Sequence, residues 1–158
     1  MNRSPHIFVD ADACPVKQEV YRVAFRCRLE VPLVANSRMQ VPDEPWITLE
    51  VVDDGFDAAD NWIVEHVQAL DIVITADVPL ASRCIKAGAR VLGPTGKPFT
   101  DDNIGQAVAT RNLLEELRGA GEITGGPAPM EKRDRSRFLQ KLDEVIQSIL
   151  RERPVDPG

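Results

Sequence analysis

The chain has 158 residues, of which 43% are hydrophobic and 28% charged, and its formal net charge is -6. This balance excludes a wholly disordered chain, and the length fits one globular domain rather than two. No apolar run approaches the roughly 20 residues of a membrane-spanning helix, and the first residues lack the pattern of a secretion signal. We therefore expect a cytoplasmic protein that makes no membrane contact.

Short apolar runs alternate with stretches of helical periodicity along the chain. We expect strands at residues 6–10, 31–35, 46–52, 71–76 and 90–92. We expect helices at residues 15–28, 57–70, 79–88, 102–117 and 131–151. Helices that connect successive strands imply right-handed crossovers and parallel pairing. The sequence therefore predicts an α/β fold of three layers, in which a mainly parallel sheet carries helices on both faces.

This pattern extends over a single predicted domain, residues 1–151, and residues 152–158 are expected to form a loose C-terminal tail. Residues 36–45 and 93–99 are predicted loops, and the glycines and prolines of residues 119–129 indicate a flexible connection before the last helix. Ligands of such sheets bind beyond the carboxyl ends of the strands. The side chains that follow the strands are therefore the first candidates for a functional site.

Four aspartates stand at or just beyond these strand ends. Asp10 closes the first strand, and Asp12 projects to the same side if the extended conformation continues. Asp77 closes a later buried strand, and Asp60 lies in the first turn of the second predicted helix. Clustered carboxylates repel one another unless a cation is present, and oxygen-only ligands suit Mg²⁺ or Mn²⁺. We therefore identify Asp10, Asp12, Asp60 and Asp77 as candidate catalytic residues.

Structural roles compete with catalysis for some of these acids. Asp57 is the favoured N-cap of its helix, which places Asp60 at the third helical position, where the helix dipole stabilises an acid. Asp77 can likewise cap the helix that begins near Pro79. Asp10 has no such explanation, because an acid placed directly after an apolar strand is costly to bury. Its position favours a functional role.

Three further residues attract attention outside the acids. Cys14 precedes a helix, where the dipole can lower a thiol pKa, but packing or shaping of the site is the preferred interpretation. Lys97 follows two glycines, yet their spacing is too short and Pro98 stands where a P-loop needs Ser or Thr. Lys97 can still meet a substrate phosphate. Asn103 either orients a water molecule or caps the helix that follows.

A chain with a negative net charge has no overall attraction for nucleic acid, so a nucleic-acid ligand requires a local group of cations. Four cations crowd the first turns of the last predicted helix: Lys132, Arg133, Arg135 and Arg137. Their position opposes the helix dipole. Either Glu131 and Asp134 offset them locally, or the cluster meets an external anion such as a nucleic-acid phosphate.

Taken together, several stretches resemble the bacterial YaiI/YqxD family. These stretches are Asp10-Ala-Asp-Ala-Cys-Pro-Val-Lys17, Asp57-Ala-Ala-Asp-Asn-Trp-Ile63, Ile74-Thr-Ala-Asp-Val-Pro-Leu80, Gly93-Pro-Thr-Gly-Lys-Pro-Phe-Thr100 with Asn103-Ile104, Gly125-Gly-Pro127 and Asp134-Arg-Ser-Arg-Phe-Leu139. The resemblance covers nearly the whole chain. It implies a PIN-like nuclease fold, in which acids at strand ends bind divalent metal and cut RNA or DNA. By position, it implies metal binding by Asp10, Asp60 and Asp77.

The leading hypothesis is a nuclease that depends on Mg²⁺ or Mn²⁺ and prefers RNA to DNA. In it Asp10, Asp60 and Asp77 hold the metal, and Asp12 positions the attacking water. The expected contacts to the nucleic-acid backbone come from Lys97, Asn103, Arg133 and Arg137.

Two alternatives remain open from the sequence. A PIN-like domain can bind RNA or a protein partner without cutting, in which case the basic cluster matters more than the acids. A phosphatase of the haloacid-dehalogenase type would use Asp10 as nucleophile and Asp12 as acid, with Lys97 and the Asp101-Asp102 pair in later motifs.

Overall fold

The computed structural model describes residues 4–53, 57–121 and 130–152 of the chain. Its strands are β1 (Ile7–Asp10), β2 (Val31–Ala35), β3 (Ile47–Val51), β4 (Ile72–Ile74), β5 (Arg90–Leu92) and β6 (Pro98–Phe99). Its helices are the short 3₁₀ turn η1 (Ala11–Ala13), α1 (Lys17–Cys27), α2 (Ala58–His66), α3 (Val78–Lys86), α4 (Ile104–Gly119) and α5 (Lys132–Glu152). The last six residues of the predicted tail and most of the predicted connection before α5 lie outside the described residues.

All of the strands belong to one sheet with the order β3-β2-β1-β4-β5-β6. The pairs from β3 to β5 are parallel, and only β6 runs antiparallel to its neighbour. Strands β1 to β3 therefore follow one another toward one edge of the sheet, and strands β4 to β6 follow one another toward the opposite edge. The crevice between β1 and β4 is the point where the strand order reverses, which is where ligands bind in open α/β sheets.

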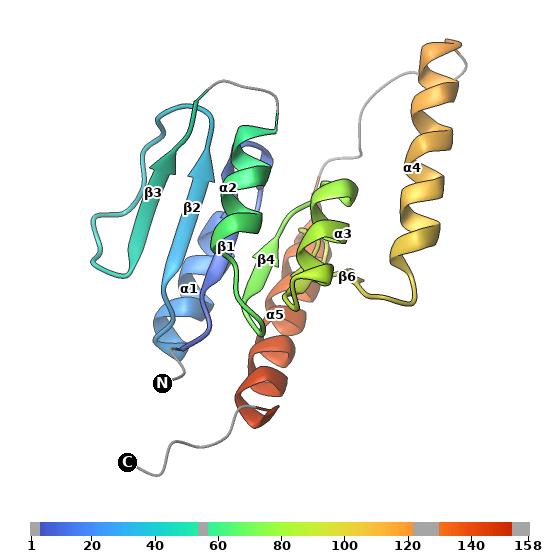
Figure 1. The fold of residues 1–158 in the computed structure, drawn as a ribbon. Coiled ribbons are helices and arrows are strands. Elements are labelled where there is room, and N and C mark those ends of the chain that lie inside the picture. The colour runs from blue at the N-terminus through green and yellow to red at the C-terminus, as the bar shows by residue number, and fades with distance from the viewer. Residues whose placement is uncertain (1–3, 54–56, 122–129, 153–158) are drawn as a thin grey trace.

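Both faces of the sheet are buried, which explains why β1 is a continuous apolar run rather than an alternating one. Ile7 and Val9 belong to a core cluster that includes residues of α1 and α5, whereas Phe8 belongs to a second cluster with residues of α2 and α3. Figure 1 shows these helix pairs on opposite sides of the sheet. The predicted three-layer α/β fold with a mainly parallel sheet is confirmed.

Helix α5 closes one face of the sheet with an apolar stripe that repeats every three or four residues. The buried side chains of this stripe are Phe138, Leu142, Ile146 and Ile149. All four are fully buried, and Phe138 has the largest side-chain volume among the fully buried residues. The last helix is therefore part of the core and not an appendage of it.

Several predicted boundaries are wrong. The helix predicted to reach residue 70 ends at His66, because the Asp71 carboxylate accepts hydrogen bonds from the Gln68 and His6 backbone N–H groups at 2.8 and 3.0 Å. Leu70 there adopts a left-handed backbone with φ 70°. The first helix begins two residues later than predicted, after η1, and the two-residue strand β6 was expected to be loop. A strand of two residues is too short to show an alternating hydrophobic pattern in the sequence.

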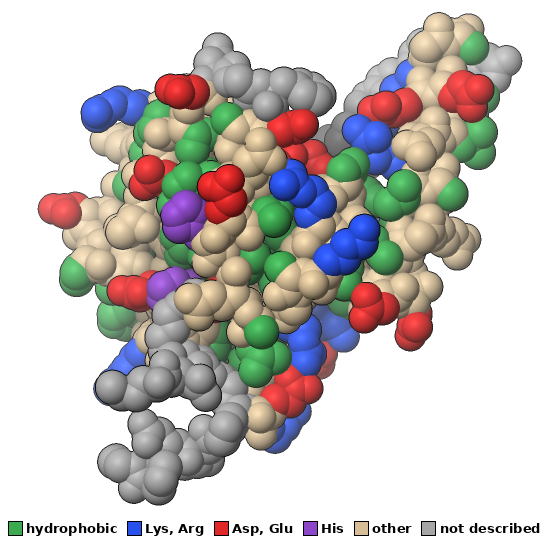
Figure 2. Space-filling view, in the orientation of Figure 1, with side chains coloured by type: hydrophobic (Ala, Val, Ile, Leu, Met, Phe, Trp, Pro, Cys, Tyr) green, Lys and Arg blue, Asp and Glu red, His purple; other side chains and the backbone are tan. Residues whose placement is uncertain are grey.

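Helix α4 is the least embedded element of the fold. It packs beside α3, and none of its 16 residues is buried. Figure 2 shows it standing out from the body of the molecule, in the view of Figure 1. No helix in the described ranges is both long enough and apolar enough to cross a membrane.

We predict that Gly96 is required for the seating of its loop on α5. Its φ is +89°, and a Cβ at this position would lie 3.1 Å from backbone atoms of Arg137. The change Gly96→Ala should lower the free energy of unfolding by about 1–2 kcal/mol, because a side chain is strained in the left-handed region. Urea unfolding measures this change. Gly105→Ala is the control, since an added Cβ there meets nothing within 4 Å; equal losses in both variants would contradict the prediction.

Candidate functional site

Asp10 stands at the reversal point of the sheet, at the carboxyl end of β1. Its Oδ2 accepts a hydrogen bond of 2.9 Å from the Thr75 hydroxyl, which follows β4. The same hydroxyl oxygen accepts a hydrogen bond of 3.0 Å from the Asp77 backbone N–H. Buried Thr75 thus joins the two strand ends and fixes both acids relative to each other. The sequence analysis assigned Thr75 no role, although a hydroxyl at the end of an apolar strand was the signal for one.

Asp77 is the N-cap of α3, which was one of the two roles predicted for it. Its Oδ1 accepts a hydrogen bond of 3.0 Å from the Leu80 backbone N–H, and Pro79 occupies the first turn. Within the described part of the chain, only this one carboxylate oxygen of Asp77 accepts a hydrogen bond. Capping therefore leaves Oδ2 for a ligand, so the structural and functional roles of Asp77 are compatible.

Asp60 occupies the third position of α2, as predicted, but the preceding cap differs from the prediction. Asp57 holds the N-cap position with φ 66°, and its side chain makes no capping hydrogen bond. An N-cap side chain reaches the helix N–H groups from an extended backbone, and a left-handed backbone does not provide that geometry. Asp57 is therefore the N-cap by position, as predicted, but its side chain does not supply the expected capping hydrogen bond.

The Asp12 side chain does not point in the predicted direction. The strand does not continue past Asp10, because the chain turns into η1, and the exposed Asp12 carboxylate accepts a hydrogen bond of 2.9 Å from the Asn36 backbone N–H. Asp12 therefore faces the carboxyl end of β2 rather than lying parallel to the Asp10 side chain. Its negative charge still contributes to the raised pKa of Asp10.

Electrostatic coupling shows that these acids share one region. Burial raises the pKa of Asp60 from 3.8 to about 6, and the charges of Asp77 and Asp10 add to the shift. Burial also raises the pKa of Asp10, where the charges of Asp77 and Asp12 oppose the stabilising bond from Thr75. Three segments distant in sequence therefore concentrate negative charge at one end of the sheet.

Arg83 is a second residue that the sequence analysis missed. It lies on α3, donates a hydrogen bond of 2.9 Å to the Asn61 side chain, and lowers the pKa of Asp60. Its charge partly offsets the repulsion among the acids. The sequence offered one signal for this role, which was a cation one helical turn after the first turn of α3.

A pocket of about 160 Å³ opens between the two strand ends. Asp10, Asp77 and Thr75 line it together with Cys14 and Pro94. Burial raises the pKa of the Cys14 thiol, so the thiolate needed for nucleophilic attack is disfavoured. The structure thus supports the shaping role that was preferred for Cys14.

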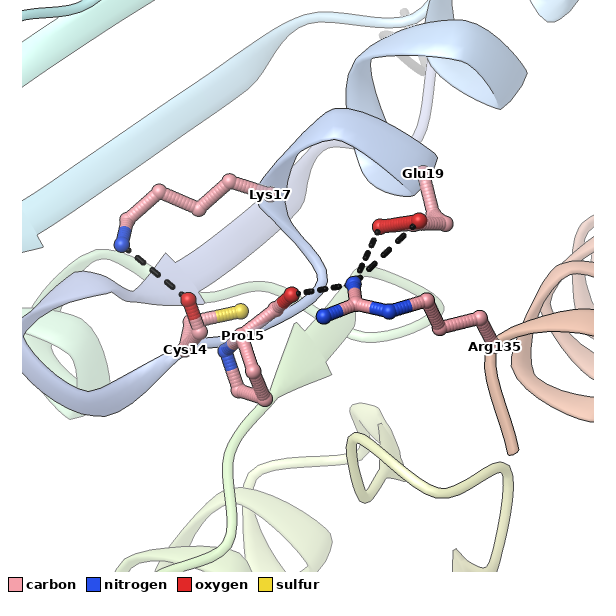
Figure 3. A network of polar contacts seen from close by, with 5 residues as sticks. All are labelled: Cys14, Pro15, Lys17, Glu19 and Arg135. Carbon is pink, nitrogen blue, oxygen red and sulfur yellow. Dashed lines mark hydrogen bonds and ion pairs between the residues drawn. The ribbon is translucent and has the colours of Figure 1, made fainter. Parts of the chain in front are cut away.

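The segment that carries Cys14 is held in place by α5. Figure 3 shows Arg135 of α5 reaching this segment, where its Nη1 donates to the Pro15 carbonyl at 2.7 Å and lies 3.3 Å from Glu19. Lys17 Nζ donates to the Cys14 carbonyl at 3.1 Å. The Glu19 side chain is 11% exposed, so its pairing with Arg135 offsets a charge that would otherwise be costly to bury.

Two other cations of the predicted basic cluster, Arg133 and Arg137, have partners within α5 or just before it. Arg133 Nε lies 2.9 Å from Glu131, and Arg137 Nη1 lies 3.9 Å from Asp134. The local offset that the sequence left open is therefore present. Both guanidinium groups are exposed, and their binding of an external anion stays a prediction.

Lys97 and Asn103 lie together on one surface feature. Both line a groove of about 510 Å³ between the β6 segment and α4. The Asn103 side chain accepts a hydrogen bond of 2.9 Å from the Thr100 N–H and donates one of 3.0 Å to the Pro98 carbonyl. Asn103 thus fastens the turn before α4, but its side chain does not cap the helix.

The donor set suits a divalent cation only in part. Among the described residues, no group of three or more His, Cys, Asp or Glu side chains is placed to hold a metal ion by itself. Mg²⁺ is commonly held by one or two carboxylates, with waters and substrate phosphates completing its octahedron. Asp10 and Asp77, which line one pocket, match that smaller requirement.

The fold and this pocket define a class: an α/β protein with a parallel central sheet and an acidic pocket at its reversal point. A profile of the family described as "Uncharacterized BCR, YaiI/YqxD family" matches residues 8–148. The chain belongs to this family, as the sequence motifs predicted. No solved structure matches the chain significantly, so the PIN-like fold implied by the resemblance stays a prediction.

Close bacterial relatives cover almost the whole chain. A UPF0178 protein of Rhodopseudomonas palustris strain HaA2 is 58% identical over 152 residues, which are 96% of this chain and 93% of the relative. A UPF0178 protein of Sphingopyxis alaskensis is 57% identical over 149 residues, which are 94% of this chain and 97% of the relative. A third, from Bradyrhizobium sp. strain ORS 278, is 55% identical over 147 residues.

We predict that removing the Asp60 charge stabilises the metal-free protein at neutral and alkaline pH. The folded-state pKa of about 6 lies above the ordinary 3.8, so charge repulsion destabilises the fold progressively as pH rises through this interval and fully above it. Asp60→Asn should raise the thermal midpoint by roughly 2–4 °C at about pH 8 and have little effect at about pH 4.

Thermal melts monitored by circular dichroism, in buffers with a chelator, measure this difference. Asp43→Asn is the control, because Asp43 is an exposed acid in the loop between β2 and β3. A midpoint that falls at about pH 8 in Asp60→Asn would contradict the prediction.

Proposed function

We propose that the protein is a divalent-metal-dependent phosphodiesterase that cleaves nucleic acid, with RNA preferred to DNA. One observation carries the proposal: Asp10 and Asp77 line one pocket at the reversal point of the sheet, where their like charges repel each other. A divalent cation removes that repulsion, and carboxylate oxygens are the ligands that Mg²⁺ and Mn²⁺ favour. The PIN-like nuclease fold that the family resemblance implies favours RNA.

The proposed roles follow from how each acid is held. Thr75 orients Asp10, and the helix N-cap orients Asp77, so both carboxylates are pre-positioned on one pocket. The charge of Asp60 on α2 would add to the attraction for the metal, whereas Asp12, directed to the Asn36 N–H, is not placed for the water-positioning role predicted for it. A bound metal ion supplies an activated water and neutralises charge on the phosphodiester.

A domain that binds nucleic acid without cutting is the second candidate. It shares the same charged surfaces, including Arg133 and Arg137, but it needs no metal ion. The phosphatase hypothesis gains no support from the geometry, because the Asp12 carboxylate is directed to the Asn36 N–H and Asp77 would have no chemical role.

We predict that Asp10→Asn abolishes both Mn²⁺ binding and nuclease activity. The change removes one negative charge from the pocket and leaves a neutral amide of nearly the same shape. Isothermal titration with Mn²⁺ and cleavage of a labelled single-stranded RNA are the measurements, with Asp43→Asn as the control of equal charge change. RNA binding by the wild type without any cleavage in Mn²⁺ or Mg²⁺ would select the non-cutting alternative.

We predict a smaller loss for Thr75→Val, which keeps the side-chain shape and removes the hydroxyl that joins the two strand ends. Partners that orient metal ligands contribute about 10- to 100-fold to metal affinity. Mn²⁺ affinity should therefore fall by about that factor. Affinity equal to that of the wild type, in a variant with an unchanged thermal midpoint, would show that Thr75 is only a structural residue.

A further inference from the structure

The groove between β6 and α4 has an unusual charge for this protein. The chain carries a net charge of -6, yet the residues that line the groove include three cations, Lys97, Arg111 and Arg118, and no carboxylate. Figure 2 shows that Lys and Arg side chains also gather over the neighbouring helix α3. The cations on that helix are Arg83 and Lys86. The surface here therefore favours an anionic ligand.

The groove begins where the acidic pocket ends. Val78 lines the groove and directly follows Asp77, which lines the pocket. Lys97 lines the groove and belongs to the loop whose Pro94 lines the pocket. The groove and the pocket are therefore lined in part by the same two segments, the start of α3 and the loop of residues 93–97.

The lining of the groove is also partly apolar. Val78, Phe99 and Leu114 contribute to it, and α4 has no buried residue despite several leucines. A helix gains most of its stability from burying an apolar face, and in the part of the chain that the structure describes α4 fully buries none of its side chains. A small anion would leave these apolar side chains without a contact, because an ion offers no apolar surface.

We propose that this groove binds single-stranded nucleic acid and guides its backbone to the acidic pocket. Lys97, Arg111 and Arg118 would contact phosphates, and the apolar side chains would contact base faces and sugars. A duplex hides its base faces in the stack, which is why a single strand fits better. This inference rests on the proposed function and deepens it by naming the substrate form and its path.

Arg111 is free to take this role at little cost. Its guanidinium lies 3.1 Å from Glu115 one turn away, and both side chains are exposed. Exposed pairs of this kind contribute little to stability, so a phosphate can replace the carboxylate as partner. This explains how a helix of mixed charge can present cations to the groove.

The test is fluorescence anisotropy with a labelled single-stranded RNA, in chelator so that no cleavage occurs. The double variant R111Q/R118Q should bind about tenfold more weakly, and the salt dependence of log affinity should lose roughly 0.7 for each lost phosphate contact. The matched control is R22Q/R151Q, which removes two exposed cations from helices α1 and α5. The control should bind like the wild type, and both variants should keep the wild-type thermal midpoint.

Three outcomes would overturn the proposal. Wild-type affinity and salt slope in R111Q/R118Q would place RNA binding elsewhere and leave the nuclease proposal intact. Equal affinity for duplex and single-stranded RNA would reject the single-strand preference. A self-associating wild type that R111Q/R118Q renders monomeric in analytical ultracentrifugation, without loss of RNA affinity, would assign the groove to a second copy of the chain. Groove-dependent binding with no cleavage in Mn²⁺ would instead refute the nuclease proposal alone.

Discussion

Parallel pairing of β1 with β4 sets the position of the candidate functional site in this molecule. The register pairs Val9 with Ile74, so the next residues along each strand, Asp10 and Thr75, leave the sheet side by side. Thr75 then bonds both Asp10 and the backbone of Asp77. Because the two strands are also central in the sheet, helices on either side shield the acids from water and raise the pKa values of Asp10 and Asp60. One strand pairing thus creates the pocket, concentrates negative charge in it and limits the exposure of its acids to water.

Holding like charges together works against folding, and the structure offsets this cost locally. Asp77 gains a helix N-cap, Asp60 lies in the favourable first turn of α2, and Arg83 opposes the negative field. These interactions fix the acids without neutralising them. A site that keeps unneutralised charge at the expense of stability is typical of binding and catalysis, because selection for packing alone would remove it.

The distribution of charge reconciles the acidic chain with the nucleic-acid ligand that we propose for it. The first turns of α5 carry many cations, but the described carboxylates of Glu131, Asp134 and Glu19 pair with them. The groove beside α4 is lined by three cations and by no carboxylate, and Arg111 alone of the three has a described ion pair, with Glu115. The average charge of a protein governs long-range attraction, whereas a bound polymer responds to the few groups within a Debye length. Local grouping therefore matters more here than the total of -6.

The sequence by itself determined the layers of the fold and most of the acidic site. Apolar runs ending in Asp10 and Asp77 report burial and strand ends directly, because both depend on neighbouring residues in the chain. Only the tertiary structure decided the strand order, the hydroxyl bridge of Thr75 and the turn that redirects Asp12. It also decided that Lys97 and Arg118 face one groove. These features depend on which distant segments become neighbours, and periodicity along a single chain carries no information about that choice.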